Sequence, residues 1–324
     1  MNPILALIFA NIIWGAASPI FKFALGNIPP FTLAFIRFFF AGILLLPFIG
    51  KIKWSELTPP EWLKLCLGSF FGITVGISFF FLGLQRAASI NAPIISSSGP
   101  VFLYFLSIFF LKEKARIKVL LGMLIALGGV LFIILSPVLF DGQGFAFGEL
   151  QGNIFYLMAM FTGLSLPVFF KKITPKMDFF KITGISFFIG SIGFIPFMLR
   201  ELQNWSFSQL DIRGMIGILF GTILSSALAY LFYNFALSKL DAEETGIFTY
   251  IDPVISILIA VPLLGEYPSV YFFAGSVLVF SGIYLAEGRL HWHPFHRLHI
   301  PIPHVILPQP YSFEKIDRHG GKAN

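Results

Sequence analysis

The chain has 324 residues, of which 56% are hydrophobic and only 12% are charged, with a formal net charge of +6. Soluble domains carry about 25% charged residues, so this composition excludes an ordinary soluble protein and indicates one that crosses a membrane several times. The single cysteine, Cys66, excludes an internal disulfide framework.

Apolar segments predict ten membrane-spanning helices, because about 20 mostly apolar residues cross a hydrocarbon core of roughly 30 Å. The first run continues past Phe23, which is too long for a signal-peptide core, so we expect it to be the first span. The fold class is therefore predicted to be an all-α membrane protein without an inserted soluble domain. The ten segments are 3–25, 31–50, 62–84, 90–111, 118–137, 150–170, 179–199, 214–236, 243–264 and 269–286.

The distribution of basic residues predicts the orientation. With an even number of spans both termini lie on one side, and placing them in the cytoplasm puts 17 Lys and Arg residues there and four outside. The positive-inside rule thus predicts cytoplasmic termini, in the plasma membrane of a bacterium or archaeon. The excess positive charge would contact anionic lipid, and nothing indicates a nucleic-acid partner.

An internal repeat divides the chain into two halves. Residues 83–113 align without gaps to residues 236–266 at an offset of 153, and near the start of each half the offset is 148. We therefore predict a first five-helix repeat over 1–137 and a second over 138–286. The matched pairs are Gly15/Gly163, Pro19/Pro167, Pro100/Pro253, Glu113/Glu266, Gly122/Gly275 and Gly129/Gly282.

Five helices is an odd number, so the second copy would enter the membrane from the opposite side, as an inverted-topology repeat. The loop charges agree, since KEKARIK follows the fourth segment whereas GEYPSV follows the ninth. Such an architecture suits a central site that is reached alternately from the two faces. The alternative is a duplication without moving parts.

With its Trp14-Gly15 pair, its Pro100 to Glu113 and Pro253 to Glu266 patterns and this repeat, the sequence resembles the EamA family of the drug/metabolite transporter superfamily. The resemblance covers about residues 3–286. It implies a ten-helix bundle with cytoplasmic termini that moves small polar metabolites or drugs by alternating access. The family's substrates include amino acids, other metabolites and toxic compounds, so no single substrate is implied.

Polar residues at helical spacing mark a candidate substrate cavity, because lipid faces such side chains only at a cost. In the ninth segment they are Thr245, Thr249, Asp252 and Ser256, and in the first they are Asn11, Trp14, Ser18 and Lys22. For any single hydroxyl the alternative is a helix–helix hydrogen bond with no role in binding. Other candidates, in the fourth, sixth and eighth segments, are Asn91, Ser96, Ser97, Ser98, Thr162, Ser165, Ser225, Ser226, Tyr230, Tyr233 and Asn234.

Asp252 is the main functional candidate, since an ionised Asp at the centre of a span costs about 2.5 to 3.5 kcal/mol. It could bind an amino or other cationic group of the substrate, or exchange a proton and so couple proton flow to transport. Pro253 cannot donate a backbone hydrogen bond, so we expect it to loosen the helix near residue 249. The resemblance adds that family members often carry an acidic residue before this proline. The alternative is a structural ion pair with Arg37.

Other charged residues leave several interpretations open. Arg37, inside the second segment, could neutralise a substrate carboxylate or extend to the membrane surface. We expect Lys22 to be an interfacial anchor. Glu113 and Glu266 are expected to cap backbone groups rather than to control opening. The glycines of GSFFGITVG (68–76) would allow another helix to approach closely.

The last segment, 287–324, contains all six histidines and is predicted to be a mostly irregular cytoplasmic tail. His291, His293 and His296 are closely spaced, but no Cys or carboxylate pattern completes a metal site. We therefore expect neither a metal nor a cofactor.

Together these features predict a secondary-active transporter, an exporter of small metabolites or drug-like compounds, with Asp252 as the proton-coupling candidate. The expected partners are a small-molecule substrate, the bilayer and protons, and the chain would be a monomer or homodimer. The alternatives are an uncoupled facilitator, a lipid-handling subunit that does not transport, and an intramembrane enzyme. An enzyme is disfavoured because the predicted spans contain one central Asp and no His.

Overall fold

All regular structure in the described part of the chain is helical, as the composition predicts. The structure is a computed structural model that describes residues 2–50, 57–99, 102, 117–139, 148–170, 173, 176–237, 239 and 247–287. Met1–Gly288 forms one compact unit, and the second unit, Arg289–Asn324, lies outside the described residues, as do the three closely spaced histidines of the tail.

Capping residues explain where several helices begin and end. The Asn2 side chain accepts a hydrogen bond from the backbone two residues later, and Pro3 follows in the first turn, where a proline loses no hydrogen bond. Thr58 and Glu61 form a capping box at the start of the helix Pro59–Ser69. Gly265, with φ +67°, ends a helix in the left-handed conformation that glycine adopts without strain.

The helices follow the predicted segments closely, apart from segment four, half of which lies outside the described residues. In the first half they are α1 Pro3–Ala24, α2 Pro30–Ile49, α3 Pro59–Ser69, η2 Phe70–Val75, α4 Gly76–Leu84, α5 Asn91–Ser97 and α7 Ile117–Leu139. In the second half they are α8 Glu149–Gly163, α9 Ser165–Phe170, α10 Phe179–Ile192, α11 Ile195–Glu201, η3 Phe207–Gln209, α12 Ile212–Leu219, η4 Phe220–Leu228, α13 Ala229–Leu237, η5 Ile247–Tyr250, α15 Ile251–Leu264 and α16 Val270–Glu287.

Five helical stretches of the described chain are long and apolar enough to cross a membrane, or six if α10 and α11, bent by 47°, form one span. Two further apolar helices, Phe248–Leu264 and Val270–Ala286, are shorter. The chain is therefore a multi-pass helical membrane protein. The five long stretches are Pro3–Ala24, Pro30–Ile49, Pro59–Leu84, Ile117–Ser136 and Ile212–Ala236.

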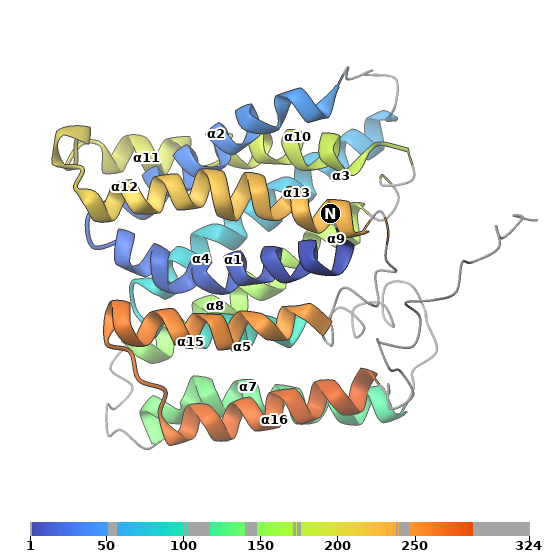
Figure 1. Ribbon diagram of the computed structural model, residues 1–324, viewed down its shortest axis with the longest axis vertical. Helices are drawn as coiled ribbons and strands as arrows, with labels where there is room; N and C mark the ends of the chain where they lie inside the picture. Colours follow the sequence, from blue (N-terminus) through green and yellow to red (C-terminus); the bar gives the residue numbers. More distant parts are fainter. Residues whose placement is uncertain are drawn as a thin grey trace, which may run out of the picture. The chain divides into compact units, whose positions relative to one another are not determined.

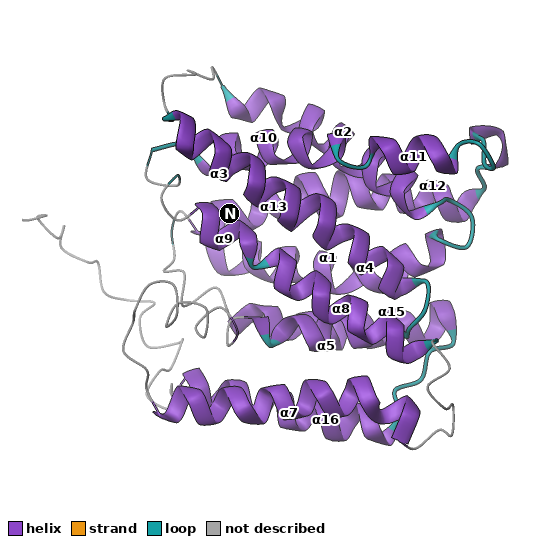
Figure 2. Cartoon of the chain, turned by 180° about the vertical axis from the view of Figure 1, so that it is seen from behind, coloured by secondary structure: helices purple, strands orange, loops and turns teal. Residues whose placement is uncertain are grey.

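Helices from the two halves interleave, so neither half packs by itself. Within the described unit α1 packs against α13 and α15, α4 packs against α8, and α2 packs against α10. Helices α7 and α16 lie side by side along one edge of the bundle, at the bottom of Figure 1, and the view from behind agrees (Figure 2).

Two pairs of glycines hold α7 close to α16, and the internal repeat converts one pair into the other. A Cβ on Gly129 would lie 2.7 Å from the carbonyl oxygen of Gly275, and a Cβ on Gly122 would collide with the carbonyl oxygen of Gly282. Because Gly122 is equivalent to Gly275 and Gly129 to Gly282, each contact is the image of the other. This is the pairing that a two-fold axis between α7 and α16 produces.

A π-helical segment occurs at the same place in both halves. The segment η2 lies between α3 and α4, and η4 lies between α12 and α13. With the offset of 153, η2 falls on residues 223–228, which are inside η4. Such wide turns are rare and often mark functional positions.

The break predicted near Pro253 takes a specific form. The 3₁₀ segment η5 precedes α15, so Pro253 lies in the first turn of the α-helix, where its missing N–H leaves no hydrogen bond unmade. Asp252 is consequently near the start of this helix and not at its middle, as the predicted segment 243–264 had placed it. The first four residues of that segment, 243–246, lie outside the described residues.

Candidate functional site

The polar face of α1 turns toward the helices of the second half. The indole Nε1 of Trp14 donates a hydrogen bond of 3.1 Å to the carbonyl oxygen of Ser225 in η4. One turn further, the hydroxyls of Ser18 and Ser256 are 3.1 Å apart and both side chains are buried. The two predicted polar stripes, on α1 and α15, therefore meet at this pair.

Aromatic side chains surround Trp14. Its ring centroid is 5.3 Å from that of Tyr230 and 5.2 Å from that of Tyr233, both on α13. Tyr230 in turn makes an edge contact of 5.1 Å with Phe187 of α10. Such tilted and edge-to-face contacts hold the rings in fixed orientations.

The buried side chains of Asn11 and Asn234 carry polar atoms without a hydrogen-bond partner among the described residues. Both residues are buried, and they lie on α1 and α13, which pack against each other. The Asn11 amide donates to the carbonyl of Leu7, but its Oδ1 has no hydrogen-bond partner among the described residues, and neither polar atom of Asn234 has one. Buried amides in native proteins normally bind protein groups or water, so these atoms indicate a polar interior.

Arg37 reaches from α2 toward η4. Its Nε donates to the Ser226 hydroxyl at 2.7 Å and its Nη2 to the Ser225 hydroxyl at 3.1 Å. The guanidinium carbon lies 4.6 Å from the ring centroids of both Phe21 and Phe38. The two serines were candidates in the sequence, but the aromatic partners were not.

Asp252 lies against α1. Its backbone touches Gly15, where a Cβ would come within 2.7 Å of the Asp252 carbonyl oxygen. The side-chain Oδ1 is enclosed and accepts no hydrogen bond from the described residues. Arg37 and Asp252 form no ion pair with each other, since the ion pairs among the described residues involve other groups. The alternative of a structural Arg37–Asp252 pair is therefore wrong, because Arg37 donates to Ser225 and Ser226 of η4 instead.

A charged cluster closes one end of the bundle, the end where α1 and α15 finish. The ammonium of Lys22 lies 2.6 Å from Glu266 and also donates to the carbonyl of Ala87 at 2.6 Å. The other oxygen of Glu266 accepts hydrogen bonds from the Ser89 N–H at 2.7 Å and from its hydroxyl at 2.6 Å. Lys22, predicted to be an interfacial anchor, thus lies in the last turn of α1 and is ion-paired with Glu266. Glu266 caps a backbone group as predicted, in the turn between α4 and α5.

Asn91 belongs to the same end and not to the central group. Its amide donates to Asn153 at 2.9 Å and to Glu149 at 3.4 Å, at the start of α8. The Tyr156 hydroxyl of α8 donates to the carbonyl of Ala88 nearby. Asn91 is the first residue of α5, as the predicted segment 90–111 implies, and its role in a cavity stays a prediction.

The hydroxyls on α5, α8 and α9 mostly bond within their own helices. Ser98 donates to the carbonyl of Ile95 at 2.6 Å and contacts the sulfur of Met160. Thr162 donates to backbone one turn earlier, and Ser165 donates to the carbonyl of Gly68 at 3.4 Å. For these residues the helix-packing alternative describes the geometry best.

The remaining predicted positions add little. Thr249 lies in η5 and is half-buried, whereas Thr245 and Glu113 lie outside the described residues. The described part of the chain contains no cluster of three His, Cys, Asp or Glu residues that could hold a metal ion. As predicted, the glycines of segment 68–76 allow close approach, with Gly72 against Leu166 and Gly76 against Thr162.

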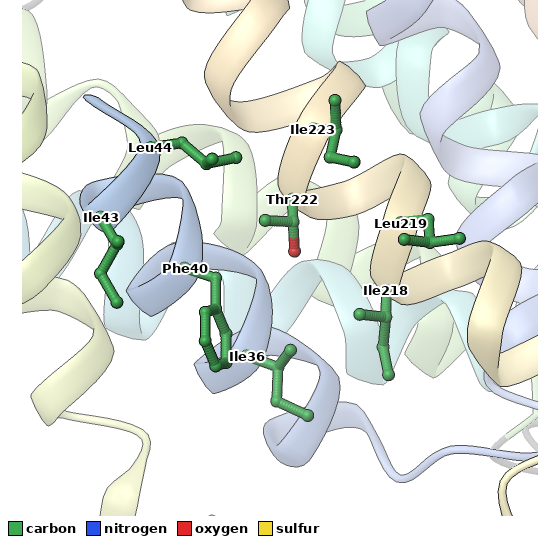
Figure 3. Close-up of a pocket in the computed structure, with 8 residues that line it drawn as sticks. All are labelled: Ile36, Phe40, Ile43, Leu44, Ile218, Leu219, Thr222 and Ile223. Atoms are coloured by element: carbon green, nitrogen blue, oxygen red, sulfur yellow. The ribbon is translucent and has the colours of Figure 1, made fainter. Parts of the chain in front are cut away.

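A separate apolar groove lies on the outside of the bundle between α2 and α12/η4, with a volume of about 360 Å³. Figure 3 shows its lining side chains, among which the Thr222 hydroxyl is the single polar group. Most of the lining side chains are exposed, as lipid-facing residues are, so we do not include this groove in the candidate site. The lining residues are Ile36, Phe40, Ile43, Leu44, Ile218, Leu219, Thr222 and Ile223.

Comparison with protein families gives one match, repeated along the chain. Residues 1–135 and residues 150–287 each match the model of the EamA-like transporter family. The two matches coincide with the two halves that the internal repeat separates.

Among individual proteins, the chain is 26% identical over 290 residues to an "Uncharacterized transporter" of Archaeoglobus fulgidus, covering 89% of this chain and 98% of that protein. It is 24% identical to a "Probable amino-acid metabolite efflux pump" of Escherichia coli (strain K12), covering 89% and 95%. One solved crystal structure superimposes with a TM-score of 0.58 at 18% identity, over 87% of this chain and 96% of that one, which shows a shared fold.

Proposed function

The chain belongs to the EamA-like transporter family, and from this premise we propose that it is a secondary-active exporter of small metabolites, amino acids among them. It is a membrane transporter and not an enzyme. The proposal of amino-acid export draws on the printed names of relatives in Escherichia coli and Salmonella typhimurium. We propose further that both termini are cytoplasmic and that the two halves form a ten-span inverted repeat.

The observation that carries this proposal is the reciprocal packing of α7 against α16. Gly122 faces Gly282 and Gly129 faces Gly275. Each glycine of α7 thus faces the α16 residue that is equivalent to the other glycine of α7. Two copies of one module related by an axis in the membrane plane produce such an exchange, and copies pointing the same way do not. The equivalent π-helical segments η2 and η4 support the same relation.

The two halves differ around the candidate cavity, as alternating access requires. Gly15 packs tightly against Asp252, whereas a Cβ on its equivalent, Gly163, would meet no described atom within 4 Å. The Lys22–Glu266 ion pair closes the end where α15 finishes, and residue 170, the equivalent of Lys22, is a phenylalanine. These differences support a state that is closed at the Glu266 end, which cytoplasmic termini would make the outer end.

We assign proton coupling to Asp252. Its Oδ1 is enclosed without a hydrogen-bond partner among the described residues, and a charge in such a place is costly, so protonation changes the balance between conformations. Helices α1, α5 and η5 pack against α15, and the titratable residues that they carry are Lys22 and Tyr250. Lys22 is already paired with Glu266, so Asp252 has no cationic partner in the described part of the chain.

The test is flux in proteoliposomes over a panel of amino acids and cationic drugs, with and without a pH gradient. We expect gradient-driven flux in the parent and its loss in Asp252→Asn. Asp211→Asn is the matched control, because Asp211 caps α12 outside the proposed cavity and Asn caps helices equally well. Gradient-driven flux that persists in Asp252→Asn would remove Asp252 as the coupling site. Flux in the parent that ignores the gradient would indicate a facilitator.

A further inference from the structure

Arg37 is a buried cation whose described partners are all neutral. Its side chain is 6% exposed, and no described carboxylate lies within 4 Å of it. The hydroxyls of Ser225 and Ser226 accept its hydrogen bonds but carry no charge. Charged residues inside membrane proteins pair with an opposite charge or line the path of a substrate. Arg37 is therefore available to an anion that is not part of the described chain.

One edge of the guanidinium remains free. Nε and Nη2 are used by the two serines, whereas Nη1 donates to no described residue. Nη1 is also not one of the fully enclosed polar atoms without a partner, so it borders accessible space. Phe21 and Phe38, each with its ring centroid 4.6 Å away, hold the plane of the group. The orientation of the guanidinium, and therefore of its Nη1 group, is thus fixed by these contacts.

The same residues connect Arg37 to the candidate cavity. Ser225 uses its hydroxyl for Arg37 and its carbonyl oxygen for the indole of Trp14. Tyr230, which contacts Trp14, lies on α13, the helix that continues η4. Arg37 therefore belongs to the wall formed by α1, η4 and α13.

The other copy of the repeat folds without this cation. With the offset of 148, Arg37 falls on Ile185, and α10 and α11 contain no basic residue between Lys181 and Arg200. With the offset of 153, Ser225 and Ser226 fall on Gly72 and Ile73. Packing of the module therefore does not require an arginine with hydroxyl partners, which argues against a purely structural role.

We propose that Arg37 binds the carboxylate of the transported metabolite, an inference that rests on the proposed function and names its substrate class. A guanidinium edge matches a carboxylate in shape and charge. One cation suits a monoanion, whereas a phosphate dianion would need a second, and Lys22 is already neutralised by Glu266. The substrates are accordingly carboxylic acids, including amino acids, rather than phosphorylated compounds or simple amines.

Binding is tested on the purified protein by thermal unfolding with a panel of amino acids, each compared with its own carboxamide and with the corresponding amine. We expect at least one acid to raise the Tm and its amide and amine to have little effect. Arg37→Gln should weaken binding of that acid by about tenfold or more. Arg37→Lys, which keeps the charge but loses the planar fork, should be intermediate. Arg200→Gln, at an exposed arginine, is the matched control and should bind as the parent does.

An absence of any acid-over-amide difference in the parent would overturn the proposal, and so would a preference that survives in Arg37→Gln. If Arg37→Gln does not fold, the proposal is still tested by comparing the Tm shifts that acids and their amides produce in the parent and in Arg37→Lys. Transport of amines or amides without a preference for acids would remove the role of Arg37 and leave the transporter standing. Acid binding without flux of any compound would count against the proposed function instead.

Discussion

Gly15 of α1 lies directly on the backbone of Asp252 in α15, so close that a Cβ on Gly15 would come 2.9 Å from the Asp252 Cα. Any larger residue at position 15 must push the two helices apart. The equivalent residue, Gly163, ends α8 and has no described neighbour within 4 Å of the corresponding point. The close contact between α1 and α15 thus depends on the absence of a side chain at Gly15.

Gly15→Ala should reduce transport strongly, because it separates α1 from the helix that carries Asp252 and breaks the register of Ser18 with Ser256. Gly163→Ala, the same change at the equivalent position, should leave transport near the parent rate. The measurement is initial flux in proteoliposomes at matched protein content. Equal loss of flux in both variants would contradict the asymmetry of the two halves.

Gly282→Ala should destabilise the protein by about 1 to 3 kcal/mol, the usual cost of overpacking, because a Cβ there collides with the backbone of Ala126 and of Gly122. Gly128→Ala is the matched control. It lies on the exposed face of α7 with no described atom within 4 Å, and alanine favours a helix over glycine by about 1 kcal/mol. Thermal unfolding in detergent should show a lower Tm for the first variant and an equal or higher Tm for the second.

Lys22→Met should open the end of the bundle that the Glu266 cluster closes, because it removes the ion pair and the hydrogen bond to Ala87. The readout is labelling of Ser256→Cys by a membrane-impermeant thiol reagent applied outside intact cells, in a Cys66→Ser background. Labelling should rise in Lys22→Met.

Lys176→Met is the control for this experiment, since it removes another lysine–glutamate ion pair, with Glu61 at the start of α3. It should leave labelling unchanged. Unchanged labelling in Lys22→Met as well would show that the ion pair does not hold this end closed.

Much of the fold could be predicted from the sequence because it depends on local composition and on the repeat. Apolar runs with capping residues at their ends define where the helices lie, as at Asn2 and Gly265. The constant offset between the halves predicted the glycine equivalences that α7 and α16 then display. The inward direction of the α1 stripe also followed, since polar side chains avoid lipid.

For the candidate site, the sequence predicts which residues take part but not which of them contact one another. Arg37 and Asp252 were the charged residues that stood out, but an ion pair between them was an equally reasonable hypothesis until their surroundings were known. Arg37 instead binds Ser225 and Ser226, and no pattern within one helix indicates that choice. The hydrogen bonds from Asn91 to Asn153 and Glu149 could not be predicted either, because those residues lie on a helix of the other half.

The sequence by itself determined that this is a helical membrane protein made of two similar halves, since hydropathy and repetition are properties of neighbouring residues. Only the tertiary structure decided which charges meet. Lys22 and Glu266 stand far apart in the chain, and helix packing brings them within 2.6 Å. The same packing gives Arg37 the hydroxyls of Ser225 and Ser226 as partners and leaves the Asp252 Oδ1 enclosed without one among the described residues, because side chains far apart in the sequence meet only when the helices pack.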